Sequence, residues 1–171
     1  KKAGSSLAMA ASVQVYIKNA ADFAAMNEVY RTFFKADPPA RTTIVSDFVV
    51  PGALLEISAI AIPNGGERKV IHPASWMKSP NPYSYGIKSG STLFLAGLVS
   101  RNGKDNSVVE GDMAAQTRVV LENARAILDG AGIVLSSVAA RNLGRSIGDE
   151  VVLATPTGYH GLVVRDVVDY V

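Results

Sequence analysis

The chain has 171 residues, of which 48% are hydrophobic and 19% are charged, and its formal net charge is +2. This composition fits a globular chain with one domain, or one domain and an appendage, that can bury a core. The Lys and Arg residues are scattered and cysteine is absent, which argues against binding to nucleic acid or a membrane surface and excludes disulfides and cysteine metal sites.

Metal binding, membrane insertion and secretion find little support in the sequence. His72 and His160 lie far apart and show no ligand spacing, so we expect no zinc site. No apolar run approaches the ~20 residues that a membrane span needs. The basic start KKAGSSLAMAASV faintly resembles a signal peptide, but its apolar part is short and leads directly into the strand-like VQVYI. We therefore expect a cytoplasmic protein.

The first third of the sequence predicts a strand, a helix and two more strands. Residues 8–18 alternate as a strand does, and Asn19 suits the N-cap of a helix. The prolines at 38–39 end that helix, and strands over 42–50 and 53–62 follow, joined by Pro-Gly. Apolar residues at spacings of three and four form one face of the helix: Phe23, Met26, Tyr30, Phe33 and Phe34.

The middle of the sequence predicts a connector, a hairpin and a second helix. Residues 63–82 hold four prolines and two adjacent glycines, as is typical of a connector. Residues 83–100 predict a hairpin that turns at Ser89-Gly90. Asp112 is a good N-cap for the second helix, which Gly130 and Gly132 end. The apolar stripe of this helix comprises Met113, Val120, Leu121, Ala124, Ile127 and Leu128.

The C-terminal residues predict a further hairpin, and they follow a weak repeat. The segments GDEVVLAT and GLVVRDVVDYV read as two strands around a TPTG turn. AGSSLAMAASVQV from residue 3 is similar to AGIVLSSVAARNL from residue 131. Both stretches are expected to follow a helix and begin a strand, so the sequence contains a trace of internal duplication.

Arg41 and Glu56 interrupt two strands that are otherwise apolar. A charge on a sheet face that is buried is costly unless it is paired. Arg41 is either a functional cation or a surface arginine paired loosely with Asp37 or Asp47. Glu56 is either a functional carboxylate or a solvated residue on an edge strand.

Several motifs together resemble the RidA (YjgF) family, with the two halves of the domain in swapped order. Pro82-Tyr83-Ser84, LFLAG at 93–97 and VEGDMAAQTRVVLENARAIL at 109–128 are similar to the family's first half. DFAAMNEVY at 22–30, PARTTIV at 39–45 and ALLEISAIAI at 53–62 are similar to its second half. Each motif is modest, but their joint occurrence is fairly specific and covers most of the chain.

The resemblance implies an α+β fold of the RidA/chorismate-mutase type, with a mixed β-sheet packed against two helices and an extra C-terminal β hairpin. Residues 1–62 would form the second half of a RidA-like domain and residues 83–142 the first half of one, with 63–82 as connector. Residues 143–171 depart from the family and form a β-rich tail of unknown role. A window cut from two tandem domains, or a circular permutant, would give this order.

The resemblance also implies a function. Family members hydrolyse reactive enamines and imines to 2-oxo acids and ammonia without a cofactor, at sites shared between the subunits of a homotrimer. Carried over by motif, Arg41 would grip the substrate carboxylate, Glu56 would hold water or relay protons, and Thr43 would supply a hydroxyl. Asn27, Tyr83 and Gly97 would bind substrate or shape the pocket.

Each of these residues also has a structural explanation. Tyr83 can pack on the sheet, Asn27 can be merely exposed, Thr43 suits any strand, and Gly97 permits close approach of the backbone. Ala96-Gly97-Leu98 replaces the Ser-Gly-Gln type of sequence common in the family and removes a hydroxyl and an amide. Two alternatives to an enzyme therefore stay open: a module that binds a small carboxylate without catalysis, and an assembly module.

Overall fold

The computed structural model describes residues 3–131, 133–136, 150–155 and 158–168. The fold is α+β, and the chain divides into two compact units, Lys1–Ile127 and Leu128–Val171. The motifs from both predicted half-domains lie in the first unit, apart from the last residues of the second helix.

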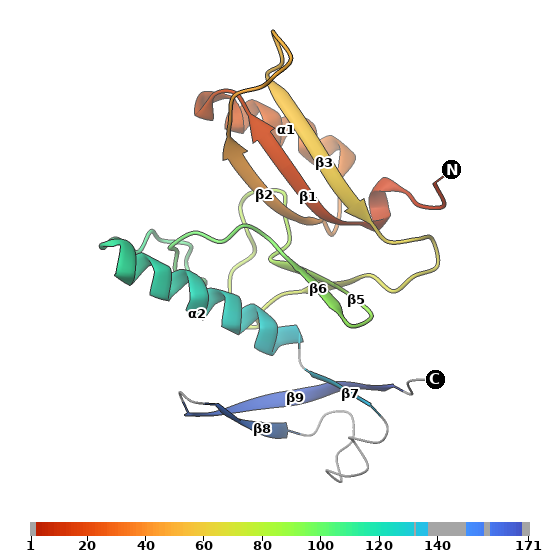
Figure 1. The fold of residues 1–171 in the computed structure, drawn as a ribbon, viewed down its shortest axis with the longest axis vertical. Coiled ribbons are helices and arrows are strands. Elements are labelled where there is room, and N and C mark those ends of the chain that lie inside the picture. Colours follow the sequence, from red (N-terminus) through yellow and green to blue (C-terminus); the bar gives the residue numbers. More distant parts are fainter. Residues whose placement is uncertain (1–2, 132, 137–149, 156–157, 169–171) are drawn as a thin grey trace. The chain divides into compact units, whose positions relative to one another are not determined.

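The first sheet has three strands in the order β2-β1-β3 (Figure 1). β1 (Ala10–Ile17) lies in the centre, parallel to β2 (Ala40–Val45) and antiparallel to β3 (Leu55–Ala61). The connection from β1 to β2 contains a short 3-10 helix (Ala20–Asp22) and α1 (Phe23–Phe33), as a parallel crossover requires. The strand predicted over 42–50 therefore stops at Val45, because β1 ends at Ile17 and offers no further partner.

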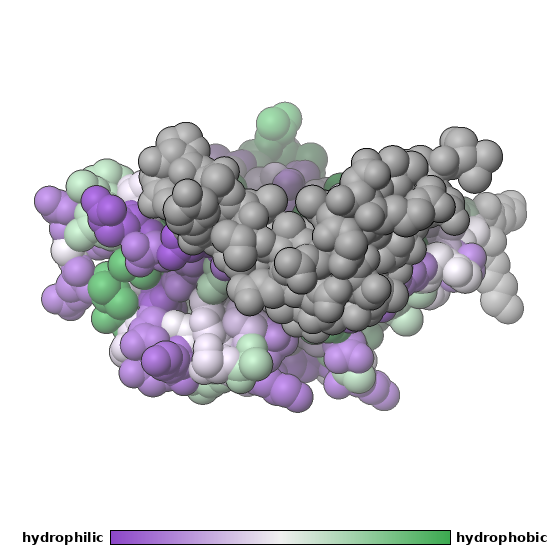
Figure 2. Space-filling model, turned by 90° about the horizontal axis from the view of Figure 1, so that it is seen from below, coloured by the Kyte–Doolittle hydropathy of each residue, from purple (hydrophilic) through white to green (hydrophobic). Residues whose placement is uncertain are grey.

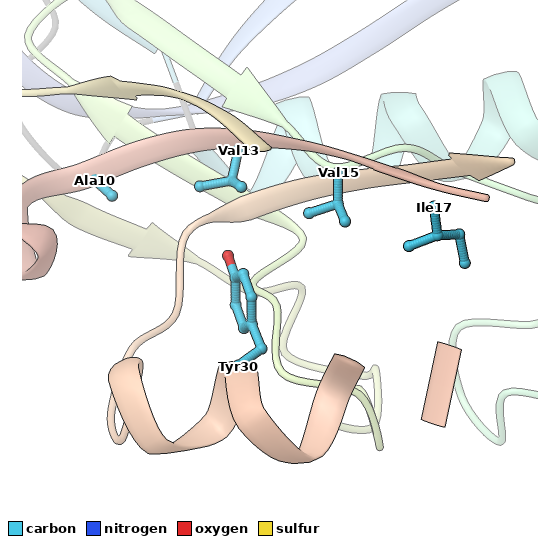
Figure 3. Packing of buried hydrophobic residues seen from close by; sticks show 5 residues of the cluster. All are labelled: Ala10, Val13, Val15, Ile17 and Tyr30. Atoms are coloured by element: carbon cyan, nitrogen blue, oxygen red, sulfur yellow. The ribbon is translucent and has the colours of Figure 1, made fainter. Parts of the chain in front are cut away.

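The face of β1 that packs on α1 forms the first core. Val13, Val15 and Ile17 alternate along the strand and point to one side, and the ring of Tyr30 reaches toward them from α1 (Figure 3). These four side chains are at least 95% buried. The spacing of three and four that predicted the helix thus places Tyr30 on the sheet, and it leaves Phe33 largely exposed.

The second sheet is an antiparallel sheet in the order β4-β5-β6, made of β4 (Lys69–Ile71), β5 (Gly86–Ser89) and β6 (Thr92–Leu95). The hairpin turns as predicted, with Gly90 at a φ of 53°, a conformation that favours glycine. β4 lies inside the segment predicted to be only a connector. Its three residues are too few to produce a recognisable alternation.

A second core joins the two sheets within the first unit. Ala11 and Ala40 come from the first sheet, Ile87 from the second, and all are completely buried. The Ser84 N–H donates to the carbonyl of Pro39 over 3.1 Å, and Ala40 and Ser84 form an isolated parallel bridge. The hairpin is therefore attached directly to the start of β2.

The helix α2 (Met113–Ala131) begins as predicted. An Asp112 carboxylate oxygen accepts the N–H of Ala115 over 2.8 Å, which is an N-cap bond. Ile127 is fully buried against Gly86 of the second sheet, where an added Cβ would lie 3.1 Å from the Ile127 side chain. Met113 and Leu121, which belong to the predicted apolar stripe, are mainly exposed.

The second unit contains a three-stranded sheet in the order β7-β9-β8. β8 (Glu150–Thr155) and β9 (Gly158–Val168) pair antiparallel, which confirms the predicted C-terminal hairpin. β7 (Ile133–Ser136) pairs parallel with β9. The centre of the predicted TPTG turn and residues 137–149 lie outside the described residues.

On the face shown in Figure 2, hydrophobic residues lie singly or in small groups among hydrophilic ones. No helix in the described ranges is both long and apolar enough to cross a membrane.

Candidate functional site

Arg41 is the second residue of β2, and its side chain is buried, with an exposed fraction of 4%. It lies opposite Val13 in the register of the sheet, so it points to the same face as α1. An arginine is rarely buried to this degree unless a partner compensates its charge. The surroundings of Arg41 therefore decide what it does.

Aromatic rings and one amide surround the guanidinium. Its Nη2 donates to the side-chain oxygen of Asn27 over 2.8 Å. Its carbon lies 4.7 Å from the ring centroid of Tyr30, 5.8 Å from that of Phe23 and 5.9 Å from that of Tyr83, within the range of cation–π interactions. These contacts hold the group in one position without neutralising it.

No carboxylate among the described residues pairs with Arg41. Asp47 forms an ion pair with Lys18, and Asp37 contributes only its carbonyl, to Arg68 over 2.8 Å. The geometry therefore excludes the surface pairing with Asp37 or Asp47 that the sequence left open. Arg41 is a buried cation without a counter-ion in the described part of the chain.

Burial lowers the pKa of Arg41, the nearby Tyr30 and Tyr83 oppose this shift, and the charge of Arg31 adds to it. Burial likewise raises the pKa of Tyr30 to about 12, although the Arg41 charge acts in the opposite direction. Tyr30 is therefore a neutral phenol at ordinary pH, and it cannot serve as the missing counter-ion.

Arg41 lines a polar cavity of about 400 Å³ together with Thr43, Tyr83 and Gly97. The Thr43 hydroxyl is buried and has no hydrogen-bond partner among the described residues, so it is an unsatisfied polar group at this cavity. The remaining lining residues include aromatic, amide and basic side chains but no carboxylate: Phe23, Pro80, Asn81, Val99, Arg101 and Asn106. Four residues that the sequence singled out thus meet at one cavity.

Asn27 positions the Arg41 guanidinium from the side of α1. It is buried on α1, accepts from Arg41, and donates through its side chain to Asn81 over 3.3 Å. One amide therefore connects β2 to the segment before Tyr83. The predicted alternative, a merely exposed asparagine, is wrong.

Backbone contacts bring Gly97 to the cavity. Its N–H donates to the carbonyl of Arg41 over 3.1 Å, so it lies directly beside β2. A Cβ added at Gly97 would lie 2.9 Å from two side-chain atoms of Thr42. The close approach expected of this glycine is therefore present.

Glu56 does not line this cavity. It is exposed on β3 and pairs in register with Tyr16, which in turn pairs with Ile44 of β2. Arg41 and Thr43 instead pair with Val13 and Val15. Because paired residues share a face, Glu56 lies on the sheet face opposite Arg41. The two side chains cannot meet within one chain.

Sequence reasoning missed Arg101, Asn81 and Asn106 as lining residues. Arg101 and Asn106 are the first and last residues of the RNGKDN segment, which predicted only a turn, and Asn81 lies in the predicted connector. The positive φ of Asn106, 59°, is typical of asparagine in turns and carries no sign of a ligand.

A larger cavity of about 610 Å³ lies between α1 and β3. Asp22 is the one charged residue in its lining, and Val29, Phe33 and Leu55 expose apolar surface there. This apolar groove suits packing rather than chemistry. No group of three or more His, Asp or Glu side chains in the described residues is arranged to hold a metal ion.

Comparisons with known proteins agree with this geometry. The family model described as Endoribonuclease L-PSP matches residues 1–63 and 74–143, which is more than half of the chain. A RutC family protein of Pyrococcus horikoshii is 44% identical over 71 residues, which cover 42% of this chain and 56% of that protein.

Two further relatives match to a similar extent. A RutC family protein of Sulfurisphaera tokodaii is 44% identical over 62 residues, 36% of this chain and 50% of that protein. Protein DfrA of Myxococcus xanthus is 34% identical over 73 residues, 42% of this chain and 56% of that protein. The chain thus spans about half the length of the curated relatives that it matches.

Proposed function

Because the chain belongs to the RidA (YjgF) family, the family described as Endoribonuclease L-PSP, we propose that it hydrolyses reactive 2-imino acids to 2-oxo acids and ammonia. Arg41 would bind the substrate carboxylate in the polar cavity. Water would add to the C=N carbon to give a carbinolamine, which then expels ammonia and leaves the carbonyl group. This reaction needs no cofactor.

The observation that carries the proposal is the buried Arg41 guanidinium, which has no counter-ion among the residues that the structure describes. Leaving a charge uncompensated in the interior costs several kcal/mol. A ligand carboxylate entering the cavity would supply the missing negative charge, and it could accept two parallel N–H bonds from the planar fork. Asn27 and the ring of Tyr30 hold that fork in place before the ligand arrives.

Other cavity groups support positioning of the imine. The Thr43 hydroxyl has no partner and can bond to the ligand or to water. Tyr83 offers an apolar wall. The backbone at Gly97 allows close approach. We assign these residues to substrate binding, with Thr43 as a candidate for contact with the reacting atoms.

A role for Glu56 requires a second copy of the chain. Its position on the opposite sheet face prevents it from reaching Arg41 of the same chain. We therefore propose a homotrimer in which Glu56 of one subunit holds the attacking water in its neighbour's cavity. Exposed apolar side chains on the sheet face that carries Glu56, namely Ile44 of β2 and Ile60 of β3, support burial of that face against another subunit.

The order of the halves is a related proposal. Residues 1–62 would represent the second half of the family domain and 83–142 the first half, joined by 63–82, with 143–171 as an added β-rich tail. The two separate segments matched by the family model, 1–63 and 74–143, support this division. A cytoplasmic location also stays a prediction.

A non-catalytic carboxylate-binding module is the second candidate. Ala96-Gly97-Leu98 lacks the hydroxyl and amide expected at the cavity wall, and the described residues of one chain place no carboxylate in the cavity to activate water. Such a module would bind 2-oxo acids through Arg41 without accelerating imine loss.

A coupled assay tests the enzyme proposal. An amino-acid lyase generates 2-iminobutanoate or 2-iminopropanoate, and loss of the imine is followed with and without the protein. We expect acceleration by wild type and by Arg118→Ala, which changes an exposed arginine of α2 outside the cavity. Arg41→Ala should abolish it.

Equal rates for wild type and Arg41→Ala would reject the enzyme proposal. Incubation with a labelled single-stranded RNA provides a second arm, because the family's description refers to an endoribonuclease. Cleavage of RNA by wild type without acceleration of imine loss would also overturn it.

A further inference from the structure

The polar cavity contains a second guanidinium that the proposed reaction does not use. Arg101 lines the same cavity as Arg41 and is exposed rather than buried. No Asp or Glu side chain within the described ranges contributes to the lining. These residues therefore give the cavity two positive side chains and no compensating negative one.

Arg101 is held at the cavity by its backbone and by its side chain. Its carbonyl accepts the side-chain N–H of Asn123 from α2 over 2.7 Å, and it forms a bridge with Val108. Its Nη1 donates to the carbonyl of Asn106 over 2.6 Å. The other guanidinium N–H groups have no acceptor among the described residues, so they are available to a ligand.

The size of the cavity also exceeds the need of a small acid. Its volume of about 400 Å³ lies within the range of sites that hold sizeable ligands. Because one water takes about 30 Å³ of the liquid, the cavity has room for roughly a dozen waters. A three-carbon imino acid bound to Arg41 would leave a large part of it to solvent, including the part beside Arg101.

We propose that Arg101 forms a second carboxylate-binding subsite, so that the preferred ligands are 2-imino and 2-oxo acids with a second carboxylate on the side chain. One carboxylate binds Arg41 at the buried end, and the other binds Arg101 at the open end. A dianion would balance both guanidinium charges, whereas a monocarboxylate balances only one. This inference rests on the proposed function for the identity of the reacting group, but not for the binding itself.

Calorimetric titration of the full chain tests the proposed second carboxylate subsite without catalytic turnover. The probes are 2-oxoglutarate and its 5-methyl ester, which share the same open carbon chain and differ by one charge. We expect 2-oxoglutarate to bind about tenfold more tightly, as one partly solvated charged hydrogen-bond pair allows. In Arg101→Gln the ratio should fall to about one, while pyruvate binding stays within about twofold of wild type.

Arg118→Gln is the matched control, because it removes a positive charge on α2 outside the cavity. An unchanged ratio in Arg101→Gln, or an equal fall in Arg118→Gln, would overturn the subsite. If binding behaves as expected but imine loss is not accelerated, the subsite stands and the proposed reaction fails. If acceleration occurs with equal affinity for 2-oxoglutarate and its 5-methyl ester, the reaction stands and the subsite fails.

Discussion

Replacing Arg41 by Gln should separate ligand binding from stability. Each charge-assisted hydrogen bond to a carboxylate contributes about 1.5–3 kcal/mol, so losing a bidentate pair weakens binding by about 3–6 kcal/mol. That loss corresponds to a Kd for pyruvate on the order of 10²- to 10⁴-fold higher. Arg41→Lys retains the charge but loses the planar fork, so its Kd for pyruvate should lie between those of wild type and Arg41→Gln.

The stability of the ligand-free protein should change much less. Arg41→Gln removes a stacking contact at 4.7 Å from Tyr30, worth about 2 kcal/mol when desolvated, and a charged hydrogen bond to Asn27. It also removes a buried charge that has no counter-ion, whose burial costs several kcal/mol. These opposing changes should leave the free energy of unfolding within about 2 kcal/mol of wild type.

Urea denaturation and calorimetry with pyruvate measure the two quantities on the same samples. Ile87→Ala provides the reference for a purely structural loss, because Ile87 is fully buried and the change should cost about 2–5 kcal/mol. An Arg41→Gln variant that loses as much stability as Ile87→Ala but binds pyruvate like wild type would show that Arg41 supports the fold and not a ligand.

Three further outcomes are expected. When the Arg41→Ala and Glu56→Gln variants are mixed and refolded together, up to about one quarter of the wild-type number of active sites should be restored, if each site uses Arg41 and Glu56 from different subunits of a ring. No recovery of activity would contradict the shared site. The free energy of unfolding should fall by about 2 kcal/mol as pH rises from 10 to 12, because the pKa of Tyr30 is about 12 in the folded state and about 10 in the unfolded state, so the unfolded state loses its proton first. Tyr30→Phe should show a smaller fall in pH-dependent denaturation, and an identical fall would refute the assignment. Gly97→Ala should destabilise the fold by about 1–3 kcal/mol in thermal or urea unfolding, because its Cβ would lie 2.9 Å from the Thr42 side chain, and a neutral result would mean that this contact relaxes freely.

The elements with strong local signals were predicted well from the sequence. The alternation over β1, the spacing in α1 and the cap at Asp112 are local properties, and each prediction was confirmed within a few residues. β4 was missed because three residues carry too little pattern, and its formation depends on pairing with β5. The strand after Arg41 was predicted too long because its end is set by its partner β1.

The candidate site could be predicted only in part, for a similar reason. Motifs identified Arg41, Thr43, Tyr83 and Gly97, which meet at the cavity. Arg101 has no motif, and it is held there by a bond to Asn106 within its own turn and by a tertiary bond from Asn123 of α2. The placement of Glu56 on the other sheet face followed from the insertion of β1 between β2 and β3, a pairing that alternation within a single strand does not specify.

The connector between the two halves, residues 63–82, is bound to the rest of the first unit by hydrogen bonds. The Asn64 N–H donates to the carbonyl of Gly4 over 2.8 Å, Arg68 bonds to the carbonyl of Ala10 over 2.9 Å, and β4 follows immediately. An exchange of halves between neighbouring molecules would have to break either these two bonds to residues 1–62 or the pairing of β4 with β5. These bonds therefore stabilise the monomer in which both halves come from one chain. A domain-swapped dimer should form only under conditions that already disrupt the connector.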